Sequence, residues 1–510
     1  MKKMTLFRSQ IVIASAAAVG CLAGCRVGPT YQRPPAIAQA PPATYKESPQ
    51  NLPGSDAWKV AQPQDAMLRG KWWEIFNDPE LNSLEDKVNV DNQNIKRAFE
   101  NFMAARAVVA EARSQLFPTV GFNPSVQGSG SSANTGSSNG STVIPTNRVS
   151  SLYSLPIDVS WEPDFFGRIR NTIREEQYAA QVTAADLENE RLIEQASLAQ
   201  FLFQIRGQDA LLALLNQTIS DYEKTLEYAR AQYETGVGTQ ISVVEAQGNL
   251  LSAQAAATHV GVARAQFEHA IAVLIGANPS TFSIPTQPLN AAPPAIPLGL
   301  PSQLLERRPD IAAAERTMAQ ANAAIGVADA AFYPTVTLGG SVGLTSSSLK
   351  HLFDWSSRVW SVGPDVSQTI YDGGLRRATV RQFVATYNAD VANYRQTVLT
   401  AFQQVEDYLA SVRILSQEIQ QQQQAVASAQ QFVDLELARY QTGIDPYVNV
   451  LTAQNTLLGD QQSLTNLRTQ AMTSSVQLIT ALGGGWDTSQ LPTPAQVSQT
   501  PPASQTAIQR

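Results

Sequence analysis

The chain repeats its own architecture, and the second copy begins about two hundred residues after the first. The segment Tyr233-Glu234-Thr235-Gly236 returns as Tyr440-Gln441-Thr442-Gly443, at an offset of 207 residues. Upstream, Phe117-Pro118-Thr119-Val120 recurs as Tyr333-Pro334-Thr335-Val336, at an offset of 216 residues. The difference places extra chain in the first copy, where a Ser/Gly-rich run extends over 128–141. Because each copy is far longer than a solenoid unit, the pattern predicts one architecture with internal pseudo-twofold symmetry.

The N-terminus has the features of an export signal. Three basic residues precede an apolar stretch over 11–20 that is too short to span a bilayer stably. The signal ends in Leu22-Ala23-Gly24-Cys25, which is similar to a bacterial lipobox. This similarity predicts cleavage after residue 24 and acylation of Cys25. Cys21 is a second candidate whose preceding residues fit the lipobox less well, and an ordinary signal cleaved nearby would leave Cys25 free.

Charge and cysteine content exclude several function classes. Loss of residues 1–24 removes three basic residues and no acid, which changes the net charge from −7 to −10. Nucleic acid is therefore not an expected partner. With Cys21 removed and Cys25 acylated, no thiol remains for a disulfide, zinc or redox site, and we expect neither metal nor cofactor. No later segment approaches 18 consecutive apolar residues, so only strands could cross a membrane.

Shifts in composition and hydrophobic period divide the chain into six regions. We expect each of the two repeats to contain helices, a β-hairpin, a long helix and a return helix. The regions are a signal peptide (1–24), a Pro-rich, lipid-anchored extended tether (25–66), the first repeat (67–276), a Pro-rich linker (277–300), the second repeat (301–483) and a polar tail (484–510).

In the first repeat a helix is predicted from Asp78 to Phe117, where Pro118 stops it. The hydrophobic period then changes from about 3.6 to 2, which predicts an antiparallel hairpin over 118–162. A proline-free helix over 164–234 follows, roughly 105 Å long at ~1.5 Å per residue. Its last third has a coiled-coil seam, and a second helix returns to Ile275 after a tight turn. The last part of the first helix, about 92–116, and this return helix together match the long helix in length, so we expect them to lie end to end beside it.

The second repeat is predicted to contain the same elements. A helix over 307–332 leads to a hairpin over 334–370, a long helix over 374–441 and a return helix that ends near Leu482. Four short amphipathic strands cannot close a barrel, and open strand edges cannot face lipid. Three copies would supply twelve strands and leave a water-filled lumen, whereas two would fill it with side chains.

Several motifs resemble those of the TolC-like outer membrane factors, in the lipoprotein (NodT-type) branch. They are Trp72-Trp73-Glu74-Ile75-Phe76-Asn77-Asp78-Pro79-Glu80-Leu81, Arg307-Arg308-Pro309-Asp310-Ile311, Ala331-Phe332-Tyr333-Pro334 and Tyr371-Asp372-Gly373-Gly374. The resemblance implies an α+β, mainly α fold: a homotrimeric α-barrel in the periplasm, continuous with a twelve-stranded outer-membrane β-barrel and surrounded by an irregular equatorial belt. It also implies an exit duct for a tripartite efflux or secretion system, working with a periplasmic adaptor and an inner-membrane pump, for which we expect the RND type.

In that family the inner helices converge at the periplasmic end and form a gate with polar contacts and acidic rings. By this resemblance the gate residues here are Asp445, Asn449, Tyr440, Arg439, Thr452 and Ser242. Three copies of Asp445 would repel one another and favour bound cations or partial protonation. Asn449 and Thr452 stand where some members have aspartates, and Ser242 stands where an acidic partner of Tyr440 can occur. An alternative role for Asp445 is an N-cap, with Pro446 as the first helical residue.

The resemblance also assigns the two helical tips of each protomer to contact with the adaptor. The tip residues are Thr235, Gly236, Val237 and Gly238 in the first repeat, and Thr442, Gly443 and Ile444 in the second. Their glycines have an alternative explanation, because a tight turn requires positive φ.

Two further classes are weighed against a duct. The pattern Gly339-Gly340-Ser341-Val342-Gly343 matches a nucleophile elbow but lies in a predicted strand, and the histidines lack metal-ligand spacing, so an enzyme is not expected. A non-conducting trimeric lipoprotein that bridges the envelope would fit the helix lengths, but it would not need the alternating strands. A channel for type I protein secretion is a third possibility within the same family.

Overall fold

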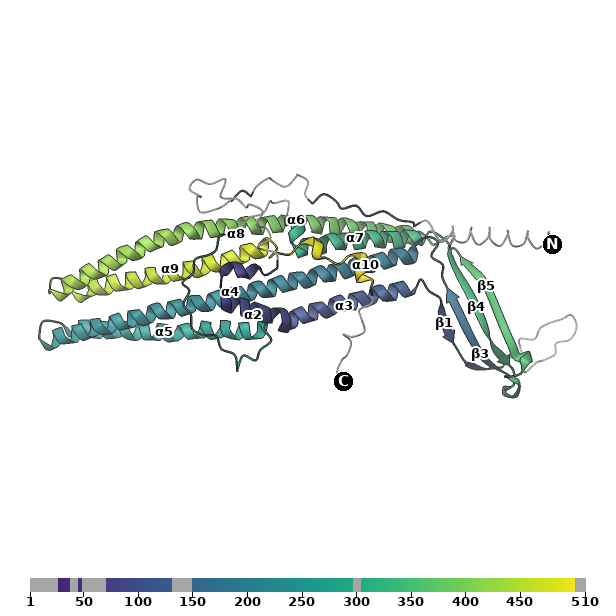
Figure 1. The fold of residues 1–510 in the computed structure, drawn as a ribbon, viewed down its shortest axis with the longest axis horizontal. Helices are drawn as coiled ribbons and strands as arrows, with labels where there is room; N and C mark the ends of the chain where they lie inside the picture. Colours follow the sequence, from purple (N-terminus) through teal and green to yellow (C-terminus); the bar gives the residue numbers. More distant parts are fainter. Residues whose placement is uncertain (1–25, 37–44, 48–69, 131–148, 297–303, 500–510) are drawn as a thin grey trace.

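The computed structural model describes residues 26–36, 45–47, 70–130, 149–296 and 304–499. It is an elongated molecule with long helices at one end and a small sheet at the other (Figure 1). In order, the principal elements are η3 Trp72–Phe76, α2 Pro79–Asp91, α3 Gln93–Ser114, β1 Thr119–Phe122, β2 Ser125–Gly130, β3 Val149–Trp161, α4 Arg168–Glu234, α5 Gln240–Leu274, α6 Leu304–Arg307, α7 Pro309–Ala330, β4 Thr335–Ser346, β5 Arg358–Ser367, α8 Leu375–Gln441, α9 Tyr447–Ala481 and α10 Pro494–Val497.

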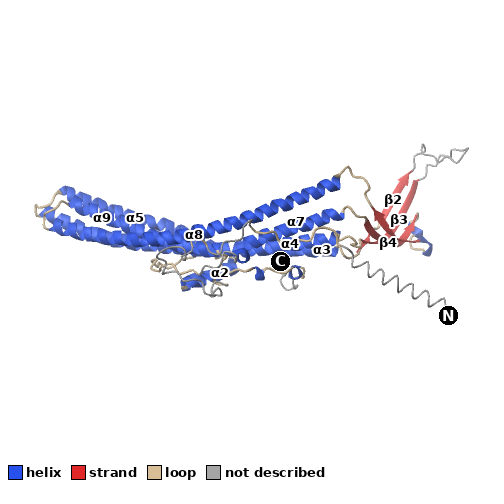
Figure 2. Cartoon of the chain, turned by 90° about the horizontal axis from the view of Figure 1, so that it is seen from above, coloured by secondary structure: helices blue, strands red, loops and turns tan. Residues whose placement is uncertain are grey.

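Corresponding helices of the two repeats have equal lengths. The long helices α4 and α8 each have 67 residues, the return helices α5 and α9 each have 35, and the helices α3 and α7 that precede the strands each have 22. Each return helix packs beside the outer half of its long helix, and α3 or α7 lies beside the half nearer the sheet (Figures 1 and 2). Two short helices in line therefore accompany one long helix, as the sequence predicts.

The predicted coiled-coil seam of α4 is buried over most of its length. Leu215, Tyr222, Leu226 and Ala229 are each at most 5% exposed, whereas Tyr233 at the tip is 48% exposed. The main hydrophobic core lies farther along the bundle, around the equator. It includes Trp72 and Trp73 of η3, whose rings meet edge to face at 5.9 Å. Among the described residues, none of the helices is both apolar enough and long enough to traverse a bilayer.

The strands form one antiparallel sheet in the order β1-β3-β4-β5, with β2 also paired to β3. Cross-strand pairs place apolar side chains together on one face, including Phe122 opposite Ile157 and Val342 opposite Trp360. These side chains are 45–75% exposed. The other face carries polar pairs such as Ser341 and Ser361. The sheet is open, with β1 and β5 at its edges.

Two boundaries predicted from the sequence are wrong. The helix predicted over 78–117 is two helices, α2 and α3, because the backbone of Asn92 is extended and its Oδ1 accepts hydrogen bonds from Asn94 N and Ile95 N at 2.8 and 3.0 Å. The first strand is also interrupted. β1 and β2 are separated at residues 123–124, where the second residue is a proline that cannot donate to β3.

The described residues of the predicted N-terminal tether lie against the helices. Tyr31 donates a hydrogen bond to Glu315 Oε1 at 2.6 Å, and Glu47 forms an ion pair with Arg413 of α8 at 2.8 Å. Tyr45 is 3% exposed and belongs to the main core. This part of the N-terminal region is thus docked on the bundle. The C-terminal region is docked as well, since Val497 of α10 is 1% exposed.

Candidate gate and docking tips

The two tips lie at the end of the helices farthest from the sheet (Figure 1). In the first tip, Gly236 has φ 79°, and the amides of Val237 and Gly238 both donate to Gln232 O at 2.9 and 2.8 Å. In the second tip, Gly443 has φ 76° and Ile444 N donates to Arg439 O at 3.0 Å. The positive φ accounts for both glycines, because a side chain would strain this conformation.

Each tip presents a large apolar side chain to solvent. Val237 is 74% exposed and Ile444 is 67% exposed. Ile241, in the first turn of α5, is 69% exposed. Apolar side chains at the apex of a turn add nothing to the stability of the isolated protomer. Exposed apolar side chains of this kind are suited to contact with another surface.

Asp445 forms an ion pair with Arg439 across the second tip. Two nitrogens of the guanidinium donate to the carboxylate: Nε of Arg439 donates to Asp445 Oδ2, and Nη2 donates to Asp445 Oδ1 at 3.2 Å. The pairing raises the pKa of Arg439, mainly through the hydrogen bond to Asp445. The capping role considered for Asp445 is wrong. Pro446 occupies the N-cap of α9, which has no side-chain cap hydrogen bond.

Tyr440 is buried in an aromatic cluster just behind the tip. Its ring centroid lies 5.5 Å from that of Tyr447 and 6.2 Å from that of Tyr228. Burial, and then the proximity of Tyr228, raises its pKa. Among the described residues its hydroxyl has no hydrogen-bond partner. This cluster joins the two coiled coils, because Tyr228 belongs to α4 and the other two tyrosines lie on α8 and α9.

The remaining predicted gate residues make local contacts in the protomer. Thr452 Oγ1 donates to Val448 O at 2.8 Å, and Asn449 N donates to Pro446 O at 3.1 Å. Ser242 Oγ lies 3.0 Å from the hydroxyl oxygen of Thr239, the N-cap residue of α5. The structure therefore brings Arg439 and Asp445 together, but it does not pair Ser242 with Tyr440. Cys25 lies outside the described residues.

A buried charge cluster near the equator was missed from the sequence. Arg206 of α4 forms an ion pair with Asp78, the N-cap residue of α2, and its Nη2 donates to Gln287 Oε1 at 3.1 Å. One turn away, Asp209 binds Arg264 of α5 at 2.7 Å and accepts a hydrogen bond from Gln287 N at 2.8 Å. The cluster fixes the inter-repeat linker to three helices. The sequence signal for this cluster was the Asp78-Pro79 step, which is typical of the start of a helix.

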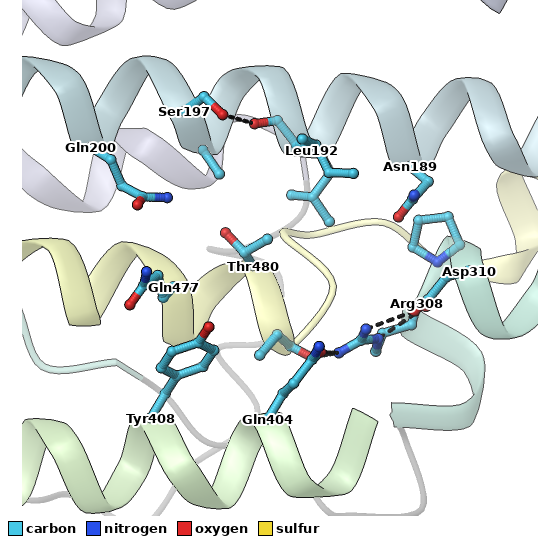
Figure 3. A pocket seen from close by; sticks show the side chains of 14 residues that line it. Asn189, Leu192, Ser197, Gln200, Arg308, Asp310, Gln404, Tyr408, Gln477 and Thr480 are labelled. Atoms are coloured by element: carbon cyan, nitrogen blue, oxygen red, sulfur yellow. Dashed lines mark hydrogen bonds and ion pairs between the residues drawn. The ribbon is translucent and has the colours of Figure 1, made fainter. Parts of the chain in front are cut away.

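An open pocket of about 350 Å³, with polar and apolar lining, lies between α4, α7, α8 and α9 (Figure 3). Arg308 donates to Gln404 Oε1 at 2.8 Å and forms an ion pair with Asp310 at 2.7 Å. Tyr408, Gln477 and Thr480 also line it (Figure 3). Across the described ranges, no group of three or more His, Cys, Asp or Glu residues could hold a metal ion.

An open sheet with one apolar face, joined end-on to paired helices of 67 and 35 residues, defines a subunit of an outer-membrane channel with a helical extension. The family model described as "Outer membrane efflux protein" matches residues 86–277 and 300–484. The chain belongs to this family.

Curated relatives and solved structures agree. The probable efflux pump outer membrane protein TtgC of Pseudomonas putida is 33% identical over 471 residues, covering 91% of this chain and 93% of that protein. OprJ of Pseudomonas aeruginosa is 32% identical, covering 91% and 94%. The outer-membrane channel OprN superposes with a TM-score of 0.80 at 27% identity, covering 91% of this chain and all of that one. The open-state MtrE channel of Neisseria gonorrhoeae superposes with a TM-score of 0.76 at 25% identity, covering 93% of this chain and 100% of that one.

Proposed function

We propose that this chain is the outer-membrane exit duct of a tripartite efflux system, assembled as a homotrimer and catalysing no reaction. The observation that carries the proposal is the open sheet, whose apolar side chains are exposed and whose two edge strands have no further partner strand among the described residues. An unsatisfied backbone group in lipid costs several kcal/mol. Pairing β5 of one protomer with β1 of the next satisfies both edges, and three protomers close the ring around a lumen.

The polar face of the sheet then lines the lumen, and the apolar face contacts lipid. The helices surround the same threefold axis, so the two coiled coils of each protomer form the wall of a periplasmic tunnel. A helix pair that exposes Ile241, Val244 and Leu251 at 56–69% is better suited to a ring than to solvent. The equatorial elements around η3, α2 and α10 form the belt.

Closure of the duct is assigned to the second tip. Three copies of Asp445 would lie around the axis, and Arg439 of the same protomer holds each carboxylate in place and offsets its charge. The pair is exposed on the Arg439 side, with 54% of that side chain accessible, so each bond is weak. A gate closed by weak bonds opens readily when a partner binds nearby.

Partners are proposed for each end of the tunnel. The exposed apolar residues Val237 and Ile444 are the sites at which a periplasmic adaptor would dock, and the adaptor connects the duct to an inner-membrane pump of the RND type. The relatives support this arrangement, because their names describe outer membrane components of efflux pumps. Acylated Cys25 would anchor the chain in the outer membrane, with the helices in the periplasm. Metabolic labelling with palmitate tests the anchor, since a Cys25→Ser variant should lose the label while Cys21→Ser keeps it.

Ion conductance in planar bilayers tests the duct directly. Purified trimers should insert and conduct, and detergent-solubilised protein should have the mass of three chains. A trimer that binds lipid but never conducts would instead be an envelope-bridging structural protein. Complementation of a strain without its outer-membrane efflux component separates efflux from protein secretion, because only an efflux duct restores resistance to small toxic compounds.

A further inference from the structure

The loop between β4 and β5 lies at the end of the sheet farthest from the helices (Figure 1). Leu349, Phe353 and Trp355 are 61%, 75% and 84% exposed, whereas Leu352 among them is only 4% exposed. Hydrogen bonds close the loop on itself: Asp354 N and Ser357 Oγ both donate to the carbonyl of residue 351, at 3.1 and 2.6 Å. The loop is therefore built around one buried leucine, and this packing holds its neighbours outward.

The exposed loop is continuous with the lipid-facing side of the sheet. Arg358 is the first residue of β5, and side chains two apart on a strand share a face. Arg358 thus extends the row formed by Trp360 and Val362, which are 75% and 77% exposed. Its guanidinium lies over the ring of Trp355, and its Nε donates to Trp355 O at 3.0 Å. The row of apolar side chains therefore ends in a cation next to an aromatic ring.

The charge of the loop is positive. Residues 349–358 contain two cations, Lys350 and Arg358, against one carboxylate, Asp354. That carboxylate is already engaged, because Asp354 Oδ2 lies 2.8 Å from the Nδ1 of His351. The Nε of Arg358 is bonded to the loop backbone, and among the described residues its Nη groups make no hydrogen bond, so they can bind a further partner. A planar guanidinium is well suited to bind two oxygens of a phosphate at once.

We propose that Trp355, Arg358 and Lys350 form a binding site for a phosphorylated lipid headgroup of the outer leaflet, such as that of lipid A. The aromatic rings lie at the depth where headgroups meet acyl chains, which is where tryptophan is favoured. The cations lie immediately beyond them, at the depth of the phosphates. The site is separate from the transport path, and it rests only on the orientation of the channel, with the helices in the periplasm.

The test measures lipid binding to the purified trimer in detergent by native mass spectrometry. Diphosphoryl lipid A is titrated, the same lipid without its phosphates is a second probe, and inorganic phosphate is a third. Each basic residue at a membrane surface contributes about fivefold in affinity. Arg358→Gln should therefore weaken binding of diphosphoryl lipid A about fivefold, and combination with Lys350→Gln should weaken it about 25-fold. Arg230→Gln, an exposed arginine on α4 far from the sheet, is the matched control.

Binding of the phosphate-free lipid should be weak and the same in all variants. Wild-type affinity in the Arg358→Gln and Lys350→Gln variants, or equal binding of the two lipids, would overturn the site. Displacement of lipid A by millimolar inorganic phosphate would assign the cations to a soluble anion instead. Should Arg358→Gln yield no trimer, Lys350→Gln carries the test, because its side chain lies in the loop outside the sheet. Conductance should be unchanged in every variant, so a failure here leaves the duct function intact.

Discussion

Replacement of Arg206 by methionine should destabilise the protomer by about 3–5 kcal/mol, because it leaves Asp78 as a buried charge without its partner. The side chains of Arg206 and Asp78 are only 9% and 7% exposed, and both lie in the cluster that fixes the inter-repeat linker. Burial lowers the pKa of Arg206, and the carboxylate of Asp209 offsets part of this effect. Methionine preserves most of the volume, so the loss would arise from charge rather than from a cavity.

Urea unfolding of the purified protein in detergent, followed by circular dichroism, would measure the loss as a shift of the midpoint at constant slope. The double variant Arg206→Met/Asp78→Asn should recover ~1–2 kcal/mol of it, because the second change removes the stranded charge. Asparagine can still cap α2, since Asp78 Oδ1 accepts from Glu80 N and Leu81 N at 3.1 and 3.2 Å. The control Arg97→Met breaks an exposed ion pair and should cost less than ~1 kcal/mol. A double variant less stable than Arg206→Met would refute the reasoning.

Three further perturbations address the tip and the N-terminal region. Asp445→Ala should raise single-channel conductance or weaken cation selectivity in planar bilayers, and if both values stay at the wild-type level, Asp445 is not part of the gate. Burial raises the pKa of Tyr447 to about 12, above its unfolded value of about 10, so its contribution to stability is complete below pH ~10 and is lost as the pH rises through 12. Thermal melts should show a smaller loss over that range in Tyr447→Phe than in the wild type; equal losses would contradict this. Gly28→Ala should detach the N-terminal segment, because a Cβ at this position would lie 2.5 Å from Gly326 Cα and the φ of Gly28 is 111°. Limited proteolysis would detect the detached segment as faster cleavage, and an unchanged cleavage rate would count against this prediction.

The helices and strands could be predicted because the sequence patterns that specify them are local and occur in both repeats. The offset between Tyr233 and Tyr440 aligns two helices of equal length, and alternation in residues such as Val342 and Trp360 defines the exposed face of the sheet. The break at Asn92 was not predicted, because asparagine is compatible with a helix until its side chain finds two free amides to cap.

The contacts of the candidate site depend on pairs that are distant in sequence or on fine geometry. Arg206 and Asp78 are 128 positions apart, and no periodicity connects them. Asp445 precedes a proline as a capping residue often does, but the turn directs its carboxylate toward Arg439 and leaves Pro446 at the cap. Sequence patterns indicated which residues gather at the tip, but not which of them pair.

The equal lengths of α4 and α8 place the two tips of a protomer at the same height. Each helix measures 67 residues, roughly 100 Å at ~1.5 Å per residue, so both coiled coils of a protomer end level with each other. Around a threefold axis this yields a flat rim of six apices, on which an encircling collar could sit without tilting. Insertions or deletions in one long helix would be tolerated only when matched in the other. The tunnel can therefore change in length only when both repeats gain or lose the same number of residues.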